Sequence, residues 1–264
     1  MSACIEISHL SKAYVRPKLL GHGDEHLVLK DISLSLRENR ILGLVGESGC
    51  GKSTLCKVLL GIEKPTSGTV LVNGQNVAEL SKARFKQLRR VMQVVYQDPY
   101  GSLDPRMDVR RLISEPLDIH GLYPEREERE KFLKELLKSV GLSEQYLARY
   151  PHEFSGGQRQ RVCIARALAL SPKILIADEP VSALDVSVQA QILNLLKEIK
   201  RTHQLSMLFV THDFAVARFL CDEIAVMYQG TIVEQAEAEE LFAHPRHAYT
   251  QQLLSAVPQV RTER

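Results

Sequence analysis

Ile41-Leu42-Gly43-Leu44-Val45 runs directly into Gly46-Glu47-Ser48-Gly49-Cys50-Gly51-Lys52-Ser53-Thr54, and this stretch decides the fold. The first five residues are a short apolar run, typical of a buried strand, and Lys52 to Leu60 has a helical pattern. The segment between them matches GxxxxGK followed by Ser in full, in the strand–loop–helix setting that makes the match specific. We therefore predict an α/β fold with a phosphate-binding loop at the carboxyl end of a parallel strand.

Each residue type in this loop has a physical reason to bind phosphate. The glycines let successive backbone N–H groups turn toward one oxyanion, and the helix start adds its positive dipole end. Lys52 supplies a full positive charge for the β- and γ-phosphates, and Ser53 is placed to ligate Mg²⁺. A glycine-rich turn without a ligand is the alternative, and both correct flanks argue against it. The predicted nucleotide contacts are Gly46, Glu47, Ser48, Gly49, Cys50, Gly51, Lys52, Ser53 and Thr54.

A second apolar strand, Ile174 to Ala177, ends in Asp178 and Glu179. Two carboxylates at the end of a buried strand are the pattern of a Walker B site. Asp178 would hold Mg²⁺, and Glu179 would orient and activate the attacking water. Strand-terminal acids are also common in solvated turns, so this pattern gains its weight from the phosphate loop upstream. Together the two motifs predict an ATPase that uses Mg²⁺.

Short aliphatic or β-branched runs recur along the chain and predict strands. They cover residues 4–8, 28–36, 41–45, 69–72, 91–96, 174–178, 207–211, 224–228 and 231–234. Helical patterns, clearest at Lys52 to Leu60 and Val186 to Thr202, alternate with several of these runs, which predicts a parallel sheet covered on both faces. Asn73-Gly74 and Gln229-Gly230 lie between extended runs and predict hairpin turns near the edge of the sheet.

The middle of the chain has a different pattern. From Arg106 to about Ala169 no segment has the character of a strand, and helical stretches such as Glu125 to Val140 are broken by Pro and Gly. We interpret this region, about residues 98–169, as a helical subdomain inserted into the α/β domain.

The composition is that of an ordinary globular protein: 264 residues, 44% hydrophobic and 25% charged, with a formal net charge of +2. A dedicated nucleic-acid binder would usually be more basic. The five cysteines are scattered and show no zinc-site spacing, so we expect free thiols in a reducing cytosol. No apolar run approaches the roughly 20 residues needed to cross a bilayer, so we expect any membrane role to come through a partner.

The segment before the second strand makes the prediction more specific. Phe154-Ser155-Gly156-Gly157-Gln158-Arg159-Gln160-Arg161 runs into the helical pattern of Val162 to Leu170 and resembles the signature sequence of ABC ATPases, which usually have Leu at the position of Phe154. A Ser and two glycines that open a helix make a second anion-binding site. In that family this site faces the ATP held by the other subunit of a head-to-tail dimer. The resemblance thus assigns Ser155, Gly156, Gly157 and Gln158 to the partner's nucleotide.

Further family motifs occur in order, so the resemblance covers nearly the whole chain and implies a P-loop NTPase (RecA-like) core, a peripheral antiparallel β-subdomain and the helical insert. Tyr14 resembles the aromatic residue that stacks on adenine. Gln97 resembles the Q-loop glutamine that reaches toward Mg²⁺ and the attacking water. Asp185 closes a D-loop, Ser182-Ala183-Leu184-Asp185, and His212 resembles the switch histidine at the γ-phosphate. Taken singly, each residue could be an exposed side chain or a local cap.

Two stretches resemble the branch of peptide and nickel importers. They are Gln97 to Arg106, and His244 to Thr250 with Leu253, Leu254 and Pro258. We expect an ABC nucleotide-binding domain over residues 1–243 and a C-terminal extension of this type over residues 244–264. Some relatives carry cysteines for an iron–sulfur cluster in that extension, and no cysteine follows Cys221 here, so we expect no such cluster.

The resemblance implies a subunit that binds and hydrolyses MgATP and powers uptake of peptides, nickel or metal–chelator complexes. The implied partners are a homologous ATPase subunit, the same or a different chain, two transmembrane permeases and, indirectly, an extracytoplasmic substrate-binding protein, without nucleic acid. The implied location is the cytoplasmic face of the inner membrane, held there by the permeases.

Two other classes of function stay open. An ABC-type ATPase acting on DNA shares these motifs, but it would carry a long coiled coil or a zinc insert in the middle of the chain. A regulatory nucleotide-binding module would be expected to lack the base, and Glu179 is present.

Two weaker signals complete the sequence. The phosphate loop places Cys50 near Lys52 and a helix start, which predicts a lowered thiol pKa and a reactive thiol that ATP would protect; an inert loop-filling side chain is the alternative. His22-Gly23-Asp24-Glu25-His26 could be imagined as a metal site, and we interpret it as a solvated loop.

Overall fold

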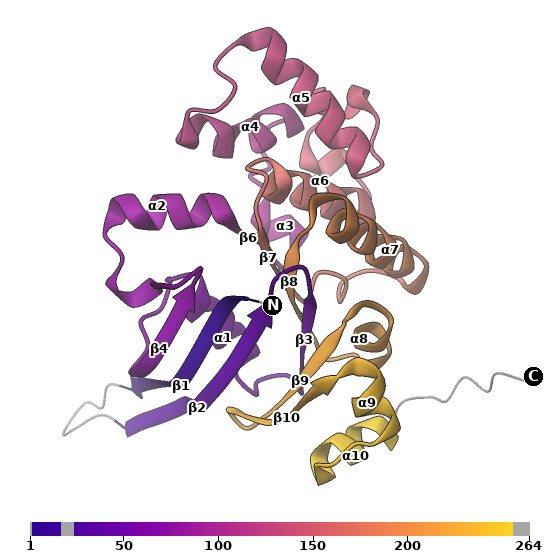
Figure 1. The fold of residues 1–264 in the computed structure, drawn as a ribbon. Coiled ribbons are helices and arrows are strands. Elements are labelled where there is room, and N and C mark those ends of the chain that lie inside the picture. The colour runs from indigo at the N-terminus through magenta and orange to yellow at the C-terminus, as the bar shows by residue number, and fades with distance from the viewer. Residues whose placement is uncertain (1, 17–23, 256–264) are drawn as a thin grey trace, which may run out of the picture. The chain divides into compact units, whose positions relative to one another are not determined.

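Two units make up the fold in the computed structural model, which describes residues 2–16 and 24–255 (Figure 1). The first unit joins residues 1–81 to residues 208–264, and the second is the intervening segment, residues 82–207. Each is described by itself below. Among the described residues, no helix combines the length and the apolar composition that crossing a bilayer requires.

An antiparallel sheet in the first unit has the strand order β2-β1-β4-β5. The strands are β1 (Ala3–Arg16), β2 (Asp24–Arg37), β4 (Ser67–Val72) and β5 (Gln75–Asn76), and the short helix η1 (Val77–Glu79) follows them. At the turn between β4 and β5, Asn73 and Gly74 have φ of 48° and 74°, so the predicted hairpin is confirmed. Two successive left-handed residues are what a tight hairpin turn needs.

The parallel strand that leads into the phosphate loop lies in the same unit. β3 (Ile41–Val45) is buried along its whole length and pairs in parallel with β9 (Glu223–Tyr228), with Val45 opposite Val226. The edge strand β10 (Thr231–Glu237) folds back antiparallel on β9. The predicted hairpin turn between them, at Gln229 and Gly230, is also confirmed. Helices α1 (Lys52–Leu59), α8 (Phe214–Leu220), α9 (Ala238–Ala243) and α10 (Ala248–Ser255) belong to this unit.

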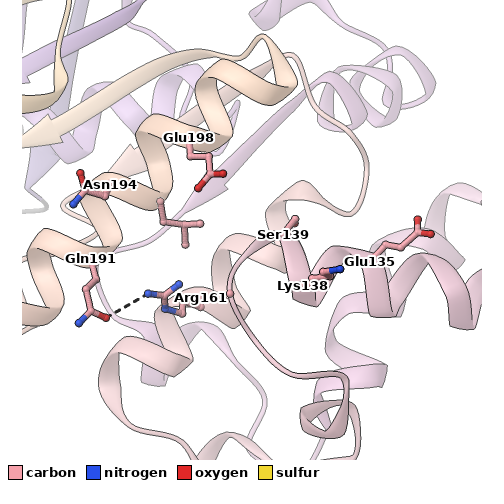
Figure 2. Close-up of a pocket in the computed structure, with 9 residues that line it drawn as sticks. Glu135, Lys138, Ser139, Arg161, Gln191, Asn194 and Glu198 are labelled. Atoms are coloured by element: carbon pink, nitrogen blue, oxygen red, sulfur yellow. Dashed lines mark hydrogen bonds between the residues drawn. The ribbon is translucent and has the colours of Figure 1, made fainter.

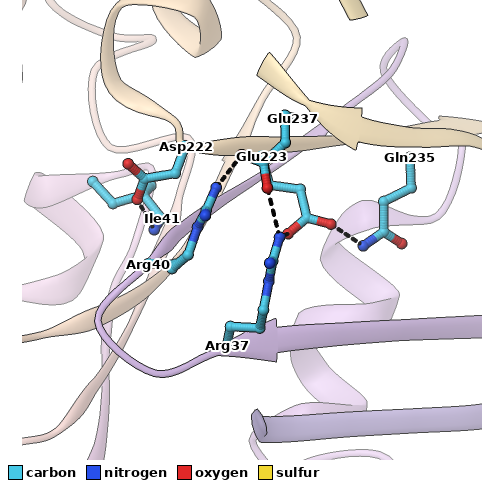
Figure 3. Close-up of polar contacts among 7 residues, drawn as sticks. All are labelled: Arg37, Arg40, Ile41, Asp222, Glu223, Gln235 and Glu237. Carbon is cyan, nitrogen blue, oxygen red and sulfur yellow. Dashed lines mark hydrogen bonds and ion pairs between the residues drawn. The ribbon is translucent and has the colours of Figure 1, made fainter. Parts of the chain in front are cut away.

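Ion pairs join the end of β2 to β9 and β10 (Figure 3). Arg37 Nη2 lies 2.7 Å from Glu223 Oε2 and 2.8 Å from Glu237 Oε1, and Arg40 pairs with the other oxygen of Glu237. Burial raises the pKa of the Glu237 carboxyl, but the hydrogen bonds and charges of the two arginines outweigh it, so the net shift of the pKa is downward. The antiparallel sheet is thereby fixed to the strands beside the phosphate loop.

The second unit is mainly helical. Its strands β6 (Met92–Val95) and β7 (Ile174–Asp178) pair in parallel, with Val95 opposite Ala177. Its helices are α2 (Lys82–Val91), α3 (Pro99–Ser102), α4 (Val109–His120), α5 (Arg126–Ser139), η2 (Glu144–Ala148), η3 (Pro151–Glu153), α6 (Gly156–Leu168) and α7 (Val186–His203). Strand β8 (Ser206–Thr211) crosses the boundary between the units.

Most of the predicted elements are present, and their ends differ in instructive ways. The region from Arg106 to Ala169 is helical without a strand, as predicted. The first strand is much longer than predicted because β1 continues through several irregular pairings to Arg16. Val91 ends helix α2 rather than starting a strand. That helix was not predicted because its sequence is strongly polar overall, and only Leu88 in it is buried.

Candidate nucleotide-binding site

The phosphate loop follows the buried strand β3 and ends at helix α1. Gly49 and Gly51 have φ of +83° and +117°, a left-handed conformation that favours glycine. A Cβ on Gly46 would lie 2.2 Å from the carbonyl oxygen of Met227, so only glycine fits against β9 at this point. The loop conformation therefore requires glycine at the positions the motif specifies.

Lysine and serine donors lie where the loop meets the helix. Lys52 is 4% exposed, and its Nζ donates to the carbonyl oxygens of Gly46 at 2.7 Å and Glu47 at 2.9 Å. Gly51 precedes α1 without a side chain that caps the helix, so the first amides of α1 are not used by a side-chain cap. Ser53 is exposed on the first turn of the helix. Glycine amides, an ammonium group and a hydroxyl fit a phosphate chain with its Mg²⁺.

The second unit brings two of the predicted catalytic residues together. Gln97 Nε2 donates to Glu179 Oε2 at 3.4 Å, across the ends of β6 and β7. Glu179 has φ of +47°, a conformation uncommon for a residue with a side chain, and its carbonyl accepts from the Ser182 hydroxyl at 3.1 Å. Asp178 is the last residue of β7 and is half-buried. The acidic pair and the glutamine thus share one end of a two-strand ladder.

The signature segment forms a capped helix start. Ser155 Oγ accepts from the Gln158 amide at 3.4 Å, and Gln158 Oε1 accepts from the Ser155 amide at 3.1 Å, a reciprocal capping box at the start of α6. Gly157 lies against α7, where a Cβ would lie 2.3 Å from Val188 Cγ1. Phe154 is 4% exposed and packs edge-on against Tyr146, which explains why an apolar residue is needed there.

Asp185 has a local role that the sequence alone did not reveal. It precedes α7, and its Oδ1 accepts from the Val188 amide at 2.9 Å and the Ser187 hydroxyl at 2.7 Å. These bonds, the amide of Val188 first, lower the pKa of the carboxyl. Asp185 is therefore a helix N-cap, and its contact with a partner's nucleotide stays a prediction.

The two remaining predicted residues belong to the unit that carries the phosphate loop. Tyr14 is half-buried on β1, and the Lys12 ammonium lies 4.8 Å from the centre of its ring. His212 is exposed directly after β8. Their roles toward adenine and the γ-phosphate stay predictions.

The prediction of a lowered pKa for the Cys50 thiol is wrong. Burial raises the pKa of the Cys50 thiol, and this effect exceeds the lowering by the charge of Lys52 and by backbone amides. All the cysteines are buried free thiols, as predicted. The sequence showed the nearby cation but not the packing that removes the thiol from water.

The histidine-rich segment does not build a metal site in the described part of the chain. Asp24, Glu25 and His26 are exposed on β2, whereas His22 and Gly23 lie outside the described residues. Over residues 2–16 and 24–255, no group of three or more His, Cys, Asp or Glu side chains has an arrangement that could hold a metal ion.

A groove in the second unit lies on α5, α6 and α7 and contains none of the predicted site residues (Figure 2). Arg161 lies in it, donating to the Val140 carbonyl at 2.7 Å and to the Gln191 side chain at 3.4 Å. Because these contacts join α6 to α5 and α7, we interpret Arg161 as a structural residue rather than a ligand contact.

Comparisons with known proteins agree with this geometry. Residues 29–182 match the family model described as ABC transporter, and residues 233–264 match the oligopeptide/dipeptide transporter C-terminal region. The oligopeptide transport ATP-binding protein OppF of Bacillus subtilis (strain 168) is 49% identical over 255 residues, 96% of this chain and 82% of the relative.

Two solved structures share the fold. The structure of cbiO1 from Clostridium perfringens, part of the ABC transporter complex cbiONQ, has a TM-score of 0.80 at 28% identity and covers 92% of each chain. The dimeric post-hydrolysis structure of the ATP-binding cassette MJ0796, bound to ADP and Pi, has a TM-score of 0.76 at 30% identity and covers 89% of this chain and 98% of the other.

The fold and the phosphate loop define an α/β ATPase of the P-loop class. More particularly, the chain belongs to the ABC transporter family, and its C-terminal region is of the oligopeptide/dipeptide type.

Proposed function

We propose that this chain is the ATP-hydrolysing subunit of an ABC importer for peptides and that it works on the cytoplasmic face of the membrane through partner permeases. The observation that carries the proposal is the complete phosphate loop, with its left-handed glycines and buried Lys52, in a chain whose end matches the oligopeptide/dipeptide region. The similar OppF is named for oligopeptide transport, which supports peptides as the substrate class. Nickel stays a prediction that this relative does not test.

The residues divide the work of hydrolysis. The amides of the loop and Lys52 bind the β- and γ-phosphates, and Tyr14 stacks on the adenine ring. Ser53, Asp178 and Gln97 would hold Mg²⁺, which neutralises phosphate charge when it is bound with ATP. Glu179 accepts the proton of the attacking water, with Gln97 and His212 orienting the water and the γ-phosphate. Each of these assignments is a proposal about the catalytic step.

The signature segment supports a proposal about dimerisation. The start of α6 would bind the ATP held by a homologous partner in a head-to-tail dimer, with Asp185 at the interface, so closure would require two nucleotides. Loss of the γ-phosphate would remove that bridge and let the dimer open. The insert that follows Gln97 would pass this movement to the permeases.

The observed insert supports transport over action on DNA. Its longer helices, α4 and α5, have 12 and 14 residues and pack with α6, whereas a DNA-maintenance ATPase would need a long heptad coiled coil. Glu179 and its contact with Gln97 support catalysis over a purely regulatory role.

The test is reconstitution of the chain with its permeases and partner ATPase in vesicles. We expect peptide uptake that depends on MgATP and phosphate release that the peptide-loaded receptor stimulates. As a control, Lys52→Ala should abolish MgATP binding by the chain. If uptake proceeds with the Lys52→Ala chain, ATP hydrolysis by this chain does not power transport. If nickel complexes and not peptides are taken up, the proposed substrate class is wrong.

A further inference from the structure

The C-terminal helix α10 places a buried tyrosine beside the strands that flank the phosphate loop. Tyr249 is 7% exposed, and its ring centre lies 4.1 Å from that of Tyr228, the last residue of β9. Such a contact between two rings has a specific geometry and fixes the position of α10 on β9.

The pairing of β3 with β9 places this ring pair at the loop. The pairing ends with Val45 opposite Val226, and Gly46 and Glu47 follow Val45 as Met227 and Tyr228 follow Val226. Gly46 lies close to the backbone of β9, because a Cβ on Gly46 would lie 2.2 Å from Met227 O. Tyr249 therefore packs against a residue of β9 that lies just beyond the last strand pair before the loop.

The hydroxyl of Tyr249 points to the same place. Its oxygen is buried and has no hydrogen-bond partner among the residues that the structure describes. Burial raises the pKa of this phenol, the backbone amide of Glu47 acts against that shift, and the negative charge of Glu47 acts with it. Glu47 of the phosphate loop is thus among the polar groups around the hydroxyl, and a buried hydroxyl favours an arrangement that pairs it.

Hydrogen bonds to the edge strand fix the position of helix α10. The Glu234 carboxylate of β10 accepts from the amides of Arg246 at 2.8 Å and His247 at 3.0 Å, directly before the helix. The Tyr249 amide donates to His247 Nδ1 at 3.1 Å. The position of Tyr249 is therefore set by the edge strand and does not depend on α10 alone.

Lys52 gives the contact a role in nucleotide binding. Its ammonium group holds the carbonyls of Gly46 and Glu47. In a nucleotide complex in which Lys52 turns to the phosphates, these two carbonyls would lose the Lys52 hydrogen bonds. The loop would keep the hydrogen bond from the Cys50 amide to Glu47 O, at 3.4 Å, and Tyr249 would be a further support beside Glu47. A contact that stabilises the loop more when phosphate is bound than when it is absent raises the affinity of the loop for the nucleotide.

We propose that Tyr249 is a positioning residue of the phosphate loop. Its ring supports the loop, and its hydroxyl oxygen accepts a hydrogen bond from the Glu47 amide when Lys52 turns to the phosphates. The C-terminal extension thereby sets the affinity for MgATP. This inference rests on the proposed function, because it takes residues 46–54 as the phosphate site.

The test measures equilibrium binding of MgATP to the full chain. Tyr249→Phe removes only the hydroxyl, and we expect the Kd to rise about five-fold. Tyr249→Leu also removes the ring, and we expect a rise of about ten-fold or more. Tyr123→Leu is the matched control: Tyr123 stacks on Phe132 with 4.4 Å between ring centres in the other unit, and its loss should leave the Kd within two-fold.

Two further readouts separate positioning from a general loss of stability. In the assembled transporter the KM for ATP should rise in both Tyr249 variants while kcat stays within two-fold. In Tyr249→Leu, Cys50 should react faster with a maleimide, and MgATP should slow the reaction.

If Tyr249→Phe, which keeps the ring and the fold, binds MgATP as wild type does, the role of the hydroxyl is wrong. If Tyr249→Leu lowers kcat at unchanged KM, the positioning role is wrong. Retained MgATP binding in Lys52→Ala would overturn the proposed function instead.

Discussion

Gln97 Nε2 lies 3.4 Å from Glu179 Oε2, within hydrogen-bonding distance. The contact is consistent with the ladder between β6 and β7, which ends with Val95 opposite Ala177, because Gln97 and Glu179 each lie two residues beyond that last pair. A glutamine that marks the start of the insert is thereby tied to the proposed general base. Both the base and the insert would respond to a change at Gln97.

Glu179→Gln should stop hydrolysis without preventing nucleotide binding. The amide keeps the size of the side chain and its contact with Gln97 but cannot accept a proton, so we expect kcat to fall by about 10²–10⁴-fold. Phosphate release and MgATP binding are measured on the same preparation, with Glu198→Gln, on the exposed part of α7, as a control. A Glu179→Gln chain that hydrolyses ATP at the wild-type rate would show that another group is the base.

Ser155→Ala should affect both stability and coupled ATPase activity. Loss of the N-cap of α6 should cost about 1 kcal/mol, and Ser155→Thr should restore most of it. If Ser155 also contacts a partner's nucleotide, the alanine variant should lose ATPase activity even where it is fully folded. Thermal unfolding and the dependence of activity on protein concentration measure the two effects. An unchanged specific activity of the folded alanine variant would leave Ser155 as a cap alone.

Much of this site could be predicted because its motifs are local. The loop Gly46 to Thr54 contains its own glycines, cation and helix start, and the Gln97–Glu179 contact follows from two neighbouring parallel strands. The roles of Asp185 and Cys50 could not be fully predicted. The cap at Asp185 competes with its interface role, and the burial of Cys50 is a property of tertiary packing.

The proposed contact of Tyr249 with the phosphate loop gave no sequence signal. About two hundred residues separate the two segments, and the ring is placed by the register of β9 beside β3. The sequence predicted a C-terminal extension over residues 244–264, but not the element against which it packs.

Cys50 should react slowly with thiol reagents, and the rate should rise steeply with pH. Its pKa is raised, so the thiolate is a small fraction at pH 7 and increases about ten-fold per pH unit until the pH reaches that pKa. Peptide mapping after a short maleimide pulse measures this site separately from the other thiols, with Cys50→Ser identifying its peptide. Labelling at pH 7 as fast as that of a free cysteine would restore the expectation from sequence.

Gly157→Ala should be destabilising, since its Cβ would lie 2.3 Å from Val188 Cγ1. Overpacking between α6 and α7 should cost about 1–3 kcal/mol, measured by denaturant unfolding. The double variant Gly157→Ala/Val188→Ala removes the clash and should recover part of that loss. If Gly157→Ala is as stable as wild type, α6 and α7 lie further apart than the structure shows.

Glu234→Gln should loosen α10 in a way that depends on pH. Burial raises the pKa of the Glu234 carboxyl, but the Thr250 hydroxyl and the amides of Arg246 and His247 lower it further, so the folded pKa lies below the ordinary value of 4.5. The carboxylate therefore stabilises the fold fully above about pH 4.5, and this contribution is lost as the pH falls through the lowered pKa. The charged side chain whose field lowers the pKa of Glu234 is His247 when protonated, whereas the Arg246 guanidinium pairs with Glu240.

The variant should thus unfold at a lower temperature than wild type at pH 7, and the difference should shrink as the pH is lowered below 4. Glu239→Gln, on the exposed face of α9, is the control for loss of one negative charge. Because Glu234 holds the segment that places Tyr249, the variant should also bind MgATP more weakly at pH 7. A difference in unfolding temperature that does not shrink as the pH falls below 4 would mean that the carboxylate charge does not hold α10.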